Sequence, residues 1–288
     1  MDIPSLTAFI AVAECGSFSI AAAQLHLTQP AISKRIASLE SQLNTSLFDR
    51  SNRQVNLNEA GRTLLPKARQ MLELLKDTRQ EITNLKEQVT GPLSMATSHH
   101  IGLRRLPDIL KEFARTYPEV TLDIHFVDSE AAYTMLQRGE IELGVITLAP
   151  QDPQNFISKT IWDDPMVFMA SRDHALASLK QVSTARLTEH QAILPGSSTF
   201  TYRLVRDLFE QKGLKLQTAM SSNYLETIRM LAAIGLAWCI LPSSMLDDDL
   251  VPLKTDFTPP SRKLGYILHR ERTLSNAARA FIELLEGR

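Results

Sequence analysis

Residues 18–40, FSIAAAQLHLTQPAISKRIASLE, contain two short helical patterns separated by a tight polar break. The apolar residues of each pattern recur at helical spacing: Ala21, Ala22 and Leu25 in the first, and Ile32, Ile36 and Leu39 in the second. Thr28 is a natural N-cap for the second helix, and Pro30 fits its first turn, where a missing N–H costs nothing. Small alanines allow the two helices to pass closely, so the stretch predicts a helix-turn-helix.

The solvent side of the second helix carries polar and basic residues, namely Gln29, Ser33, Lys34 and Arg35. Such side chains bind base edges and phosphates. The formal net charge of the chain is −1, but residues 28–69 hold seven basic and three acidic residues. Because phosphate binding needs only a local basic face, this distribution is compatible with DNA. An ordinary surface hairpin is the alternative, but caps, apolar stripe and donor face agree on DNA binding.

The run AAAQLHLTQPAISKRIASLE resembles the DNA-binding motif of the LysR-type transcriptional regulators. The matching residues are Ala21, Ala22, Leu25, Thr28, Gln29, Pro30, Ala31, Ile32, Ser33, Ile36, Leu39 and Glu40. The resemblance implies a mainly-α winged helix-turn-helix domain over residues 1–58. The residues expected to contact DNA are Thr28, Gln29, Pro30, Ser33, Lys34, Arg35, Arg50 and Arg53.

The last two arginines belong to a predicted wing hairpin. Short extended pieces at 47–48 and 55–57 flank a polar tip, and arginines at such a tip can enter the minor groove. A solvated charged turn is the alternative. A Leu-Phe-x-Arg sequence at this place belongs to the wing in the LysR-type family, which favours that role for Leu47, Phe48 and Arg50.

Residues 59–90 are predicted to form a linker helix, helical from about 59 to 89 and capped by Asn58. Such a helix of some 30 residues spans about 45 Å, and its apolar residues alternate in steps of four and three from Leu64 to Val89, which is a heptad seam. Such a seam favours a second copy of the helix, although packing against the rest of the same chain is the alternative. The residues expected at the dimer contact are Leu64, Ala68, Met71, Leu75, Ile82 and Leu85. A homodimer or homotetramer would bind an interrupted palindrome in promoter DNA, with half-sites about 34–36 Å apart.

Gly91-Pro92 ends the linker, and strands and helices alternate beyond it. The expected strands are 93–98, 120–127, 141–148, 156–162, 166–171, 237–242 and 263–269, and the expected helices are 103–117, 129–138, 201–212, 224–234 and 274–286. Alternation of this kind predicts parallel α/β sheets. We expect an effector-binding domain over 91–288 with two Rossmann-like lobes, lobe I being 91–161 and 266–288 and lobe II 162–265. Leu106-Pro107, Tyr117-Pro118 and Gly139-Glu140 resemble LysR-type effector domains, which share the periplasmic-binding-protein-like fold.

Ligands of open α/β sheets bind at the carboxyl ends of strands and at helix N-termini. This rule selects an effector site made of Thr97, Ser98, His99, His100, Ser129, Thr147, Ser197, Thr199 and Thr201. Hydroxyls and free backbone N–H groups at two facing helix starts would bind a small anion. Residues 96–100 and Thr147 look like the anion-contacting positions of one LysR-type regulator, but Ser98 and His100 depart from its threonines. The alternative is that these residues only cap helices.

His99 and His100 lie together on an expected strand, where neighbours point to opposite faces, and no other metal ligand is suitably spaced. We therefore expect no metal, and favour a histidine that titrates near neutrality or donates to an anion.

The chain lacks a membrane-length apolar run, a secretory signal and any catalytic or nucleotide-binding motif, and it has only two cysteines. We expect a cytoplasmic, sequence-specific transcriptional regulator without a cofactor, controlled by a small and anionic co-inducer, and acting on RNA polymerase. No membrane partner is expected. The alternatives are a solute-binding protein of the same effector fold and, without motif support, an enzyme.

Overall fold

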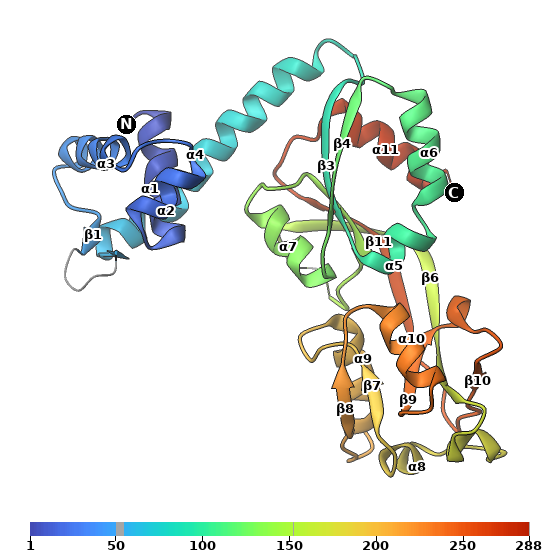
Figure 1. Ribbon diagram of the computed structural model, residues 1–288. Coiled ribbons are helices and arrows are strands. Elements are labelled where there is room, and N and C mark those ends of the chain that lie inside the picture. Colours follow the sequence, from blue (N-terminus) through green and yellow to red (C-terminus); the bar gives the residue numbers. More distant parts are fainter. Residues whose placement is uncertain (50–54, 152, 288) are drawn as a thin grey trace. The chain divides into compact units, whose positions relative to one another are not determined.

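The computed structural model describes residues 1–49, 55–151 and 153–287. The chain divides into two compact units, Met1–Lys86 and Glu87–Arg288. Figure 1 shows helices and a short hairpin in the first unit, and mixed sheets flanked by helices in the second. The expected fold class, a winged helix-turn-helix followed by an α/β effector domain, is confirmed.

The first unit is built around the predicted helix-turn-helix. Its described elements are α1 (Ile3–Cys15), α2 (Phe18–Gln24), α3 (Gln29–Leu43), β1 (Phe48–Asp49), β2 (Asn56–Leu57) and α4 (Glu59–Asn84). Thr28 caps α3, its hydroxyl accepting from the Ala31 N–H at 3.4 Å, and Asn58 caps α4. Both predicted caps are therefore confirmed.

The core of this unit joins α1 and α3 to the hairpin. Ile32, Ile36 and Leu39 are fully buried, and the Phe9 ring packs on Phe48 with centroids 5.5 Å apart. Glu40 accepts a hydrogen bond from the Leu47 N–H at 2.7 Å. The motif glutamate therefore anchors the loop that leads into β1.

The predicted wing is present as an antiparallel pair in which Phe48 lies opposite Leu57. Its proposed tip, with Arg50 and Arg53, lies outside the described residues. The structure therefore confirms the hairpin strands, and the roles of the two arginines stay predictions.

Helix α4 ends at Asn84, earlier than expected. Glu87 has a φ of 53°, a left-handed conformation that an α-helix cannot include. Val89 then packs against the core of the second unit. Val89, the last apolar residue of the expected helix, therefore belongs to a different core, and the prediction of helix to residue 89 was wrong.

The seam residues within α4 also divide into two groups. Ala68 is fully buried and Leu64 is half-buried in the core of their own unit, as the alternative interpretation required. Leu75 is half-buried, whereas Met71 and Ile82 are 44% and 62% exposed. Leu85 is exposed and follows the end of the helix. Only the later part of the seam is free for another chain.

The second unit contains a nine-stranded sheet with the strand order β4-β3-β5-β11-β6-β9-β7-β8, with β10 paired to β6. The strands are β3 (Gly91–Thr97), β4 (Val120–Phe126), β5 (Leu143–Thr147), β6 (Phe156–Ser171), β7 (Ala192–Leu194), β8 (Thr218–Ser221), β9 (Trp238–Pro242), β10 (Leu250–Pro252) and β11 (Ser261–His269). The helices are α5 (His99–Arg104), α6 (Pro107–Thr116), α7 (Ser129–Gln137), α8 (Thr184–Thr188), α9 (Phe200–Glu210), α10 (Leu225–Ala233) and α11 (Asn276–Glu286). The short 3₁₀ helices are η1 (Ala175–Ser178) and η2 (Ser243–Met245).

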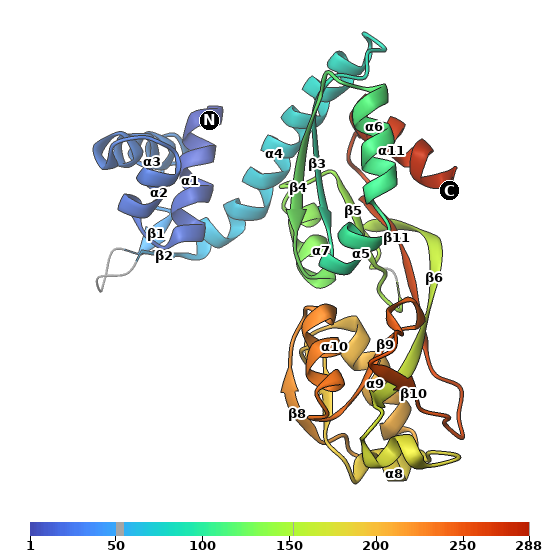
Figure 2. The same ribbon diagram turned by 45° about the vertical axis from the view of Figure 1, so that its right-hand side comes forward.

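Two long strands connect the lobes. Strand β6 runs antiparallel to β11 from Phe156 to Pro165, and Figure 2 shows both passing from one lobe into the other. The expectation of two strands at 156–162 and 166–171 was wrong, because β6 is continuous. Pro165 is tolerated because β11 begins opposite it, and β6 then pairs with β9 from Met166. Both expected lobe boundaries fall inside these strands.

Other local predictions need correction. The expected helix 103–117 is two helices, since Pro107 lacks an N–H and begins α6 instead of continuing α5. Helix α8 and strands β7, β8 and β10, each three to five residues long, were not predicted. Elements this short carry too few residues for a clear period.

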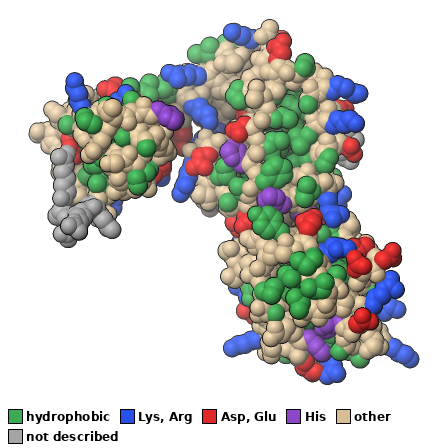
Figure 3. Space-filling view, in the orientation of Figure 1, with side chains coloured by type: hydrophobic (Ala, Val, Ile, Leu, Met, Phe, Trp, Pro, Cys, Tyr) green, Lys and Arg blue, Asp and Glu red, His purple; other side chains and the backbone are tan. Residues whose placement is uncertain are grey.

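Apolar side chains gather on the surface over α10, where Met230, Ile234 and Leu236 are 46%, 64% and 53% exposed (Figure 3). Such a cluster on one face is typical of a contact surface. Among the described residues, no helix combines the length and apolarity needed to cross a membrane.

Gly61 offers a test of the packing between α4 and the hairpin. A Cβ at this position would collide with the backbone carbonyl of Leu47 and the side chain of Leu57. Alanine improves helix propensity by about 1 kcal/mol, whereas overpacking costs about 1–3 kcal/mol. We expect Gly61→Ala to destabilise the first unit by about 1 kcal/mol or more in urea unfolding followed by circular dichroism.

Both tryptophans, Trp162 and Trp238, lie in the second unit. The unfolding transition followed by their fluorescence should therefore be the same in Gly61→Ala and wild type. Thr63→Ala, at an exposed position of the same helix, is the control and should stay within about 0.5 kcal/mol. A stabilised Gly61→Ala variant would show that the hairpin does not pack closely against α4.

Candidate functional site

The exposed face of α3 is the first candidate site. Thr28, Gln29, Pro30, Ser33 and Lys34 are exposed, while Arg35 is half-buried. The apolar side chains of the same helix face the core, so the polar face projects away from the unit. All six described residues of the predicted DNA contact therefore lie at or near this one surface.

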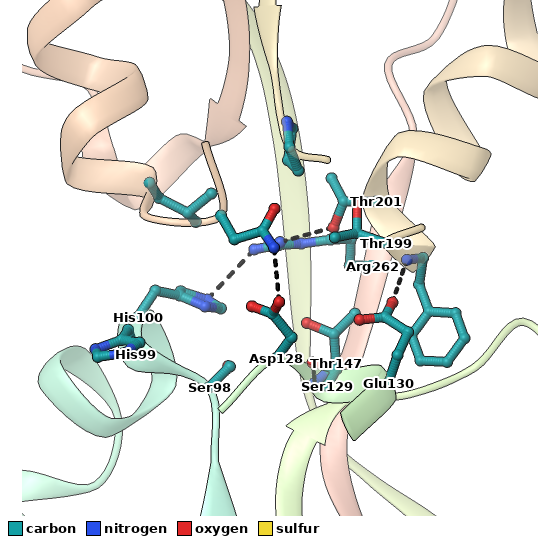
Figure 4. A pocket seen from close by; sticks show the side chains of 14 residues that line it. Ser98, His99, His100, Asp128, Ser129, Glu130, Thr147, Thr199, Thr201 and Arg262 are labelled. Atoms are coloured by element: carbon teal, nitrogen blue, oxygen red, sulfur yellow. Dashed lines mark hydrogen bonds between the residues drawn. The ribbon is translucent and has the colours of Figure 1, made fainter. Parts of the chain in front are cut away.

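A pocket between the lobes of the second unit is the second candidate site (Figure 4). Its volume is about 50 Å³, which is room for a few water molecules. The residues that line it are Ser98, His99, His100, Asp128, Ser129, Glu130, Thr147, Pro195, Thr199, Phe200, Thr201, Asn223, Leu225 and Arg262. Because these residues come from both lobes, a ligand here would contact each of them.

Seven of the nine predicted effector residues line this pocket: Ser98, His99, His100, Ser129, Thr147, Thr199 and Thr201. Thr97 is buried at the end of β3, behind the lining, and Ser197 is exposed outside it. The nine predicted residues do not include the other half of the lining, four members of which carry polar or charged side chains: Asp128, Glu130, Pro195, Phe200, Asn223, Leu225 and Arg262.

The first lobe contributes the loops that follow β4 and β5. The Ser129 hydroxyl accepts from the Thr147 N–H at 3.2 Å, which ties the start of α7 to the end of β5. Asp128, beside it, accepts a hydrogen bond from the Asn223 amide at 2.6 Å. Since Asn223 lies in the second lobe, this bond closes one side of the pocket.

The second lobe contributes the start of α9. Thr199 caps this helix, accepting from the Tyr202 N–H at 3.1 Å and donating to the Gly196 carbonyl at 2.8 Å. The Phe200 N–H donates to the carboxylate of Glu130 in the first lobe. Two of the backbone N–H groups at this helix start, those of Phe200 and Tyr202, therefore already have partners and are not free for an anion.

Glu130 is held in an unusual environment for a carboxylate. Burial raises its pKa, whereas the hydrogen bond from Phe200 and the charge of Arg203 act in the opposite direction. In Figure 4 its carboxylate points toward the second lobe, as Asp128 does. Two acidic side chains thus span the interlobe gap.

Arg262 and Asp164 form a buried ion pair beside the pocket. They face each other across β11 and β6, and Nε of Arg262 donates to Asp164 at 3.0 Å. The guanidinium also donates to the Thr201 hydroxyl at 3.1 Å and to Nε2 of His100 at 3.3 Å. Burial lowers the pKa of Arg262, and Asp164 counteracts that effect.

His100 is a neutral acceptor in this cluster. Burial, followed by the charges of Arg262, Arg105 and Arg104, lowers its pKa to about 3. Because a guanidinium only donates, Nε2 is the unprotonated nitrogen and Nδ1 carries the proton. The prediction of a histidine titrating near neutrality is therefore wrong for His100.

His99 and His100 are also not on a strand, since both begin α5. His99 packs against the rings of Phe126 and Tyr224, with centroids 5.5 and 4.7 Å apart.

A sequence signal for Arg262 did exist. From Ser261 to Leu264 the exposed and buried positions of β11 alternate, and Arg262 shares the buried phase with Leu264. In β6 Asp164 shares the phase of Met166 and Phe168. A charged residue in the apolar phase of a strand indicates a buried partner, and each of these strands contains one.

The comparisons with known proteins agree with this architecture. A family model described as "LysR substrate binding domain" matches residues 86–288, and one described as "Bacterial regulatory helix-turn-helix protein, lysR family" matches residues 3–62. A RuBisCO operon transcriptional regulator from Acidithiobacillus ferrooxidans is 30% identical over 288 residues, covering 97% of this chain and 92% of that relative.

Two solved structures share the fold. Full-length CbnR complexed with its target DNA has a TM-score of 0.63 at 24% identity, covering 100% of this chain and 99% of that chain. The CcmR regulatory domain from Synechocystis PCC6803, in complex with 2-PG, has a TM-score of 0.62 at 21% identity, covering 69% of this chain and 97% of that chain.

A helix-turn-helix unit followed by a two-lobed ligand-binding unit defines a transcriptional regulator, not an enzyme. The chain belongs to the LysR-type family of transcriptional regulators.

The neutral state of His100 makes the stability of the second unit depend on pH. Its pKa of about 3 in the folded chain lies below the unfolded value of about 6.5. The unfolded chain therefore takes up the proton first, and stability that is complete above about pH 6.5 is lost as the pH falls toward 3. We expect a loss of about 2 kcal/mol between pH 8 and pH 5.

The measurement is urea unfolding followed by tryptophan fluorescence at both pH values. His100→Gln should lack this part of the pH dependence, while the surface variant His125→Gln should keep it. An equal pH dependence in wild type and His100→Gln would show that the buried histidine does not cause it.

Proposed function

We propose that this regulator binds promoter DNA through the exposed face of α3, under the control of a small metabolite with an anionic group bound in the interlobe pocket. The observation that carries the proposal is the pocket itself, where polar groups of both lobes converge. A ligand that contacts both lobes can bias their relative position, and so alter a second site.

For DNA, Gln29 and Ser33 would read base edges in the major groove, with Lys34 and Arg35 gripping phosphates. Thr28 and Pro30 would set the approach of the helix. Arg50 and Arg53 would extend the contact into the minor groove. The structure of CbnR with its target DNA supports this use of the fold.

For assembly, the exposed apolar residues of α4, Met71 and Ile82, would contact a second copy of the chain. Leu75 and Leu85 would extend this contact, whereas Leu64 and Ala68 serve the core of their own unit. A homodimer or homotetramer would present paired α3 helices to an interrupted palindrome. Ligand binding would change how the copies of the chain pack against one another. This change would alter DNA bending or contact with RNA polymerase in the cytoplasm.

For the ligand, Ser98, Thr147 and Arg262 offer hydroxyl and guanidinium donors to an anionic group. The small volume of the pocket limits the ligand to a few heavy atoms unless the lobes open. The CcmR regulatory domain in complex with 2-PG supports a small-molecule effector in this fold.

DNA binding is tested by selecting sequences from a random DNA library with the full chain. We expect a sequence with two related half-sites. Lys34→Ala should weaken binding to all sequences and reduce the slope of log K against log salt concentration by about 1. Gln29→Ala should relax the base preference at one position of each half-site. Lys180→Ala, in the second unit, is the control.

Failure of the full chain to select any sequence would favour the alternative, a solute-binding protein of the same effector fold.

Effector binding is tested by thermal-shift screening of the full chain against carboxylates, sulfur oxyanions and amino acids. We expect a binder whose affinity falls roughly 5- to 30-fold in Ser98→Ala and Thr199→Ala, since each loses one or two hydrogen bonds. Ser197→Ala, outside the lining, is the matched control. The same binder should change the footprint or bend of the selected DNA, and an unchanged complex would contradict the proposed control.

A further inference from the structure

The charges around the pocket are not those of a simple anion site. Among the described residues that line the pocket, Arg262 is the only lysine or arginine. Its charge is already neutralised by the ion pair with Asp164. His100 is neutral. Asp128 and Glu130 add two carboxylates to the lining, so negative charge exceeds positive charge there.

The two carboxylates have acceptor capacity to spare. Asp128 accepts from Asn223, and Glu130 accepts from the Phe200 N–H. A carboxylate has about four acceptor sites. Glu130 also accepts from its own backbone N–H, so two bonds occupy Glu130 and one occupies Asp128, and both carboxylates keep acceptor sites open. Both residues lie at the start of α7, and Figure 4 shows their oxygens on the same side of the pocket. An ammonium group, with three donors, is complementary to such a wall.

Donors line another part of the same pocket. The Ser98 hydroxyl is shielded from solvent and has no hydrogen-bond partner among the residues that the structure describes. Arg262 presents its guanidinium between Thr201 and His100. An unpartnered hydroxyl and a guanidinium in one lining both suit a carboxylate, because both groups donate. The lining thus offers both acceptor and donor groups around a volume of about 50 Å³.

We propose that the effector is a small ammonium carboxylate, of the amino-acid class, whose ammonium group binds Asp128 and Glu130 and whose carboxylate binds Ser98 and Arg262. This inference rests on the proposed effector site and narrows its ligand from any anion to a zwitterion. Asp128 and Glu130 are then the residues that discriminate an amino acid from the corresponding hydroxy acid.

A purely structural role for the two carboxylates, holding the lobes together, makes a different prediction. Asp128→Asn and Glu130→Gln keep a carbonyl oxygen that can accept from Asn223 and the Phe200 N–H, while the charge is lost. If the residues only hold the lobes together, both variants bind every ligand as wild type does. If they bind an ammonium group, the variants lose affinity only for ligands that carry one.

The experiment is calorimetric titration of the full chain with glycine and the nineteen other common amino acids in their L forms, and with matched probes that lack one group. The probes for glycine are glycolate and methylamine, those for L-alanine are L-lactate and ethylamine, and sulfate represents a simple anion. We expect one amino acid to bind at least tenfold more tightly than its hydroxy acid. Asp128→Asn and Glu130→Gln should each lower the affinity for that amino acid at least tenfold. The affinity for the hydroxy acid should stay the same or rise.

Asp173→Asn and Glu119→Gln, both exposed and outside the pocket, are the matched controls and should bind as wild type. Tryptophan fluorescence establishes that each variant is folded. A hydroxy acid or sulfate that binds as tightly as the amino acid overturns the inference but leaves the effector site standing. Unchanged amino-acid affinity in both variants also overturns it. If none of the amino acids binds, the inference is overturned, and the wider thermal-shift screen of carboxylates and sulfur oxyanions decides separately whether the effector site stands.

Discussion

The buried pair of Arg262 and Asp164 is the interaction on which the two-lobed unit depends. Each is at most 5% exposed, and removing one partner of such a pair leaves a buried charge at a cost of about 3–5 kcal/mol. The pair joins β6 to β11, the strands that run through both lobes, and two of the other N–H donors of Arg262 bind Thr201 and His100. One guanidinium thus connects the crossing strands to α5 and α9, and orients the side chains of the pocket between them.

The first unit could be predicted closely because its signals are local. Thr28 caps α3 through a residue three positions away, and the stripe of Ile32, Ile36 and Leu39 lies within two turns of one helix. The linker was predicted less well. Heptad spacing cannot show which partner covers a seam, and Ala68 is covered by its own unit while Val89 belongs to the next one.

The pocket could be predicted only in part, because local sequence signals do not report contacts between residues far apart in the chain. Ser98, Ser129 and Thr147 follow strands directly, so the rule for strand ends selects them. The bonds that complete the pocket join residues far apart in the chain: Glu130 and Phe200 are 70 positions apart, and His100 and Arg262 are 162 apart. No periodicity reports such pairs, and the charged residue in the apolar phase of β11 was the only local sign of them.

The interlobe bonds and the expected ligand contacts use the same side chains, and this coincidence has a consequence for regulation. Asp128 and Glu130 hold the second lobe through Asn223 and the start of α9. A ligand that binds these carboxylates must share or replace those bonds, so it cannot bind without changing the free energy of lobe closure. Linkage then applies to any second binding surface that is sensitive to lobe closure. If the ligand changes the affinity of that surface for its partner by some factor, the partner changes the affinity for the ligand by the same factor. In the proposed binding mode, effector specificity and the regulatory signal would both originate in these two carboxylates, with the Arg262–Asp164 pair as the fixed support behind them.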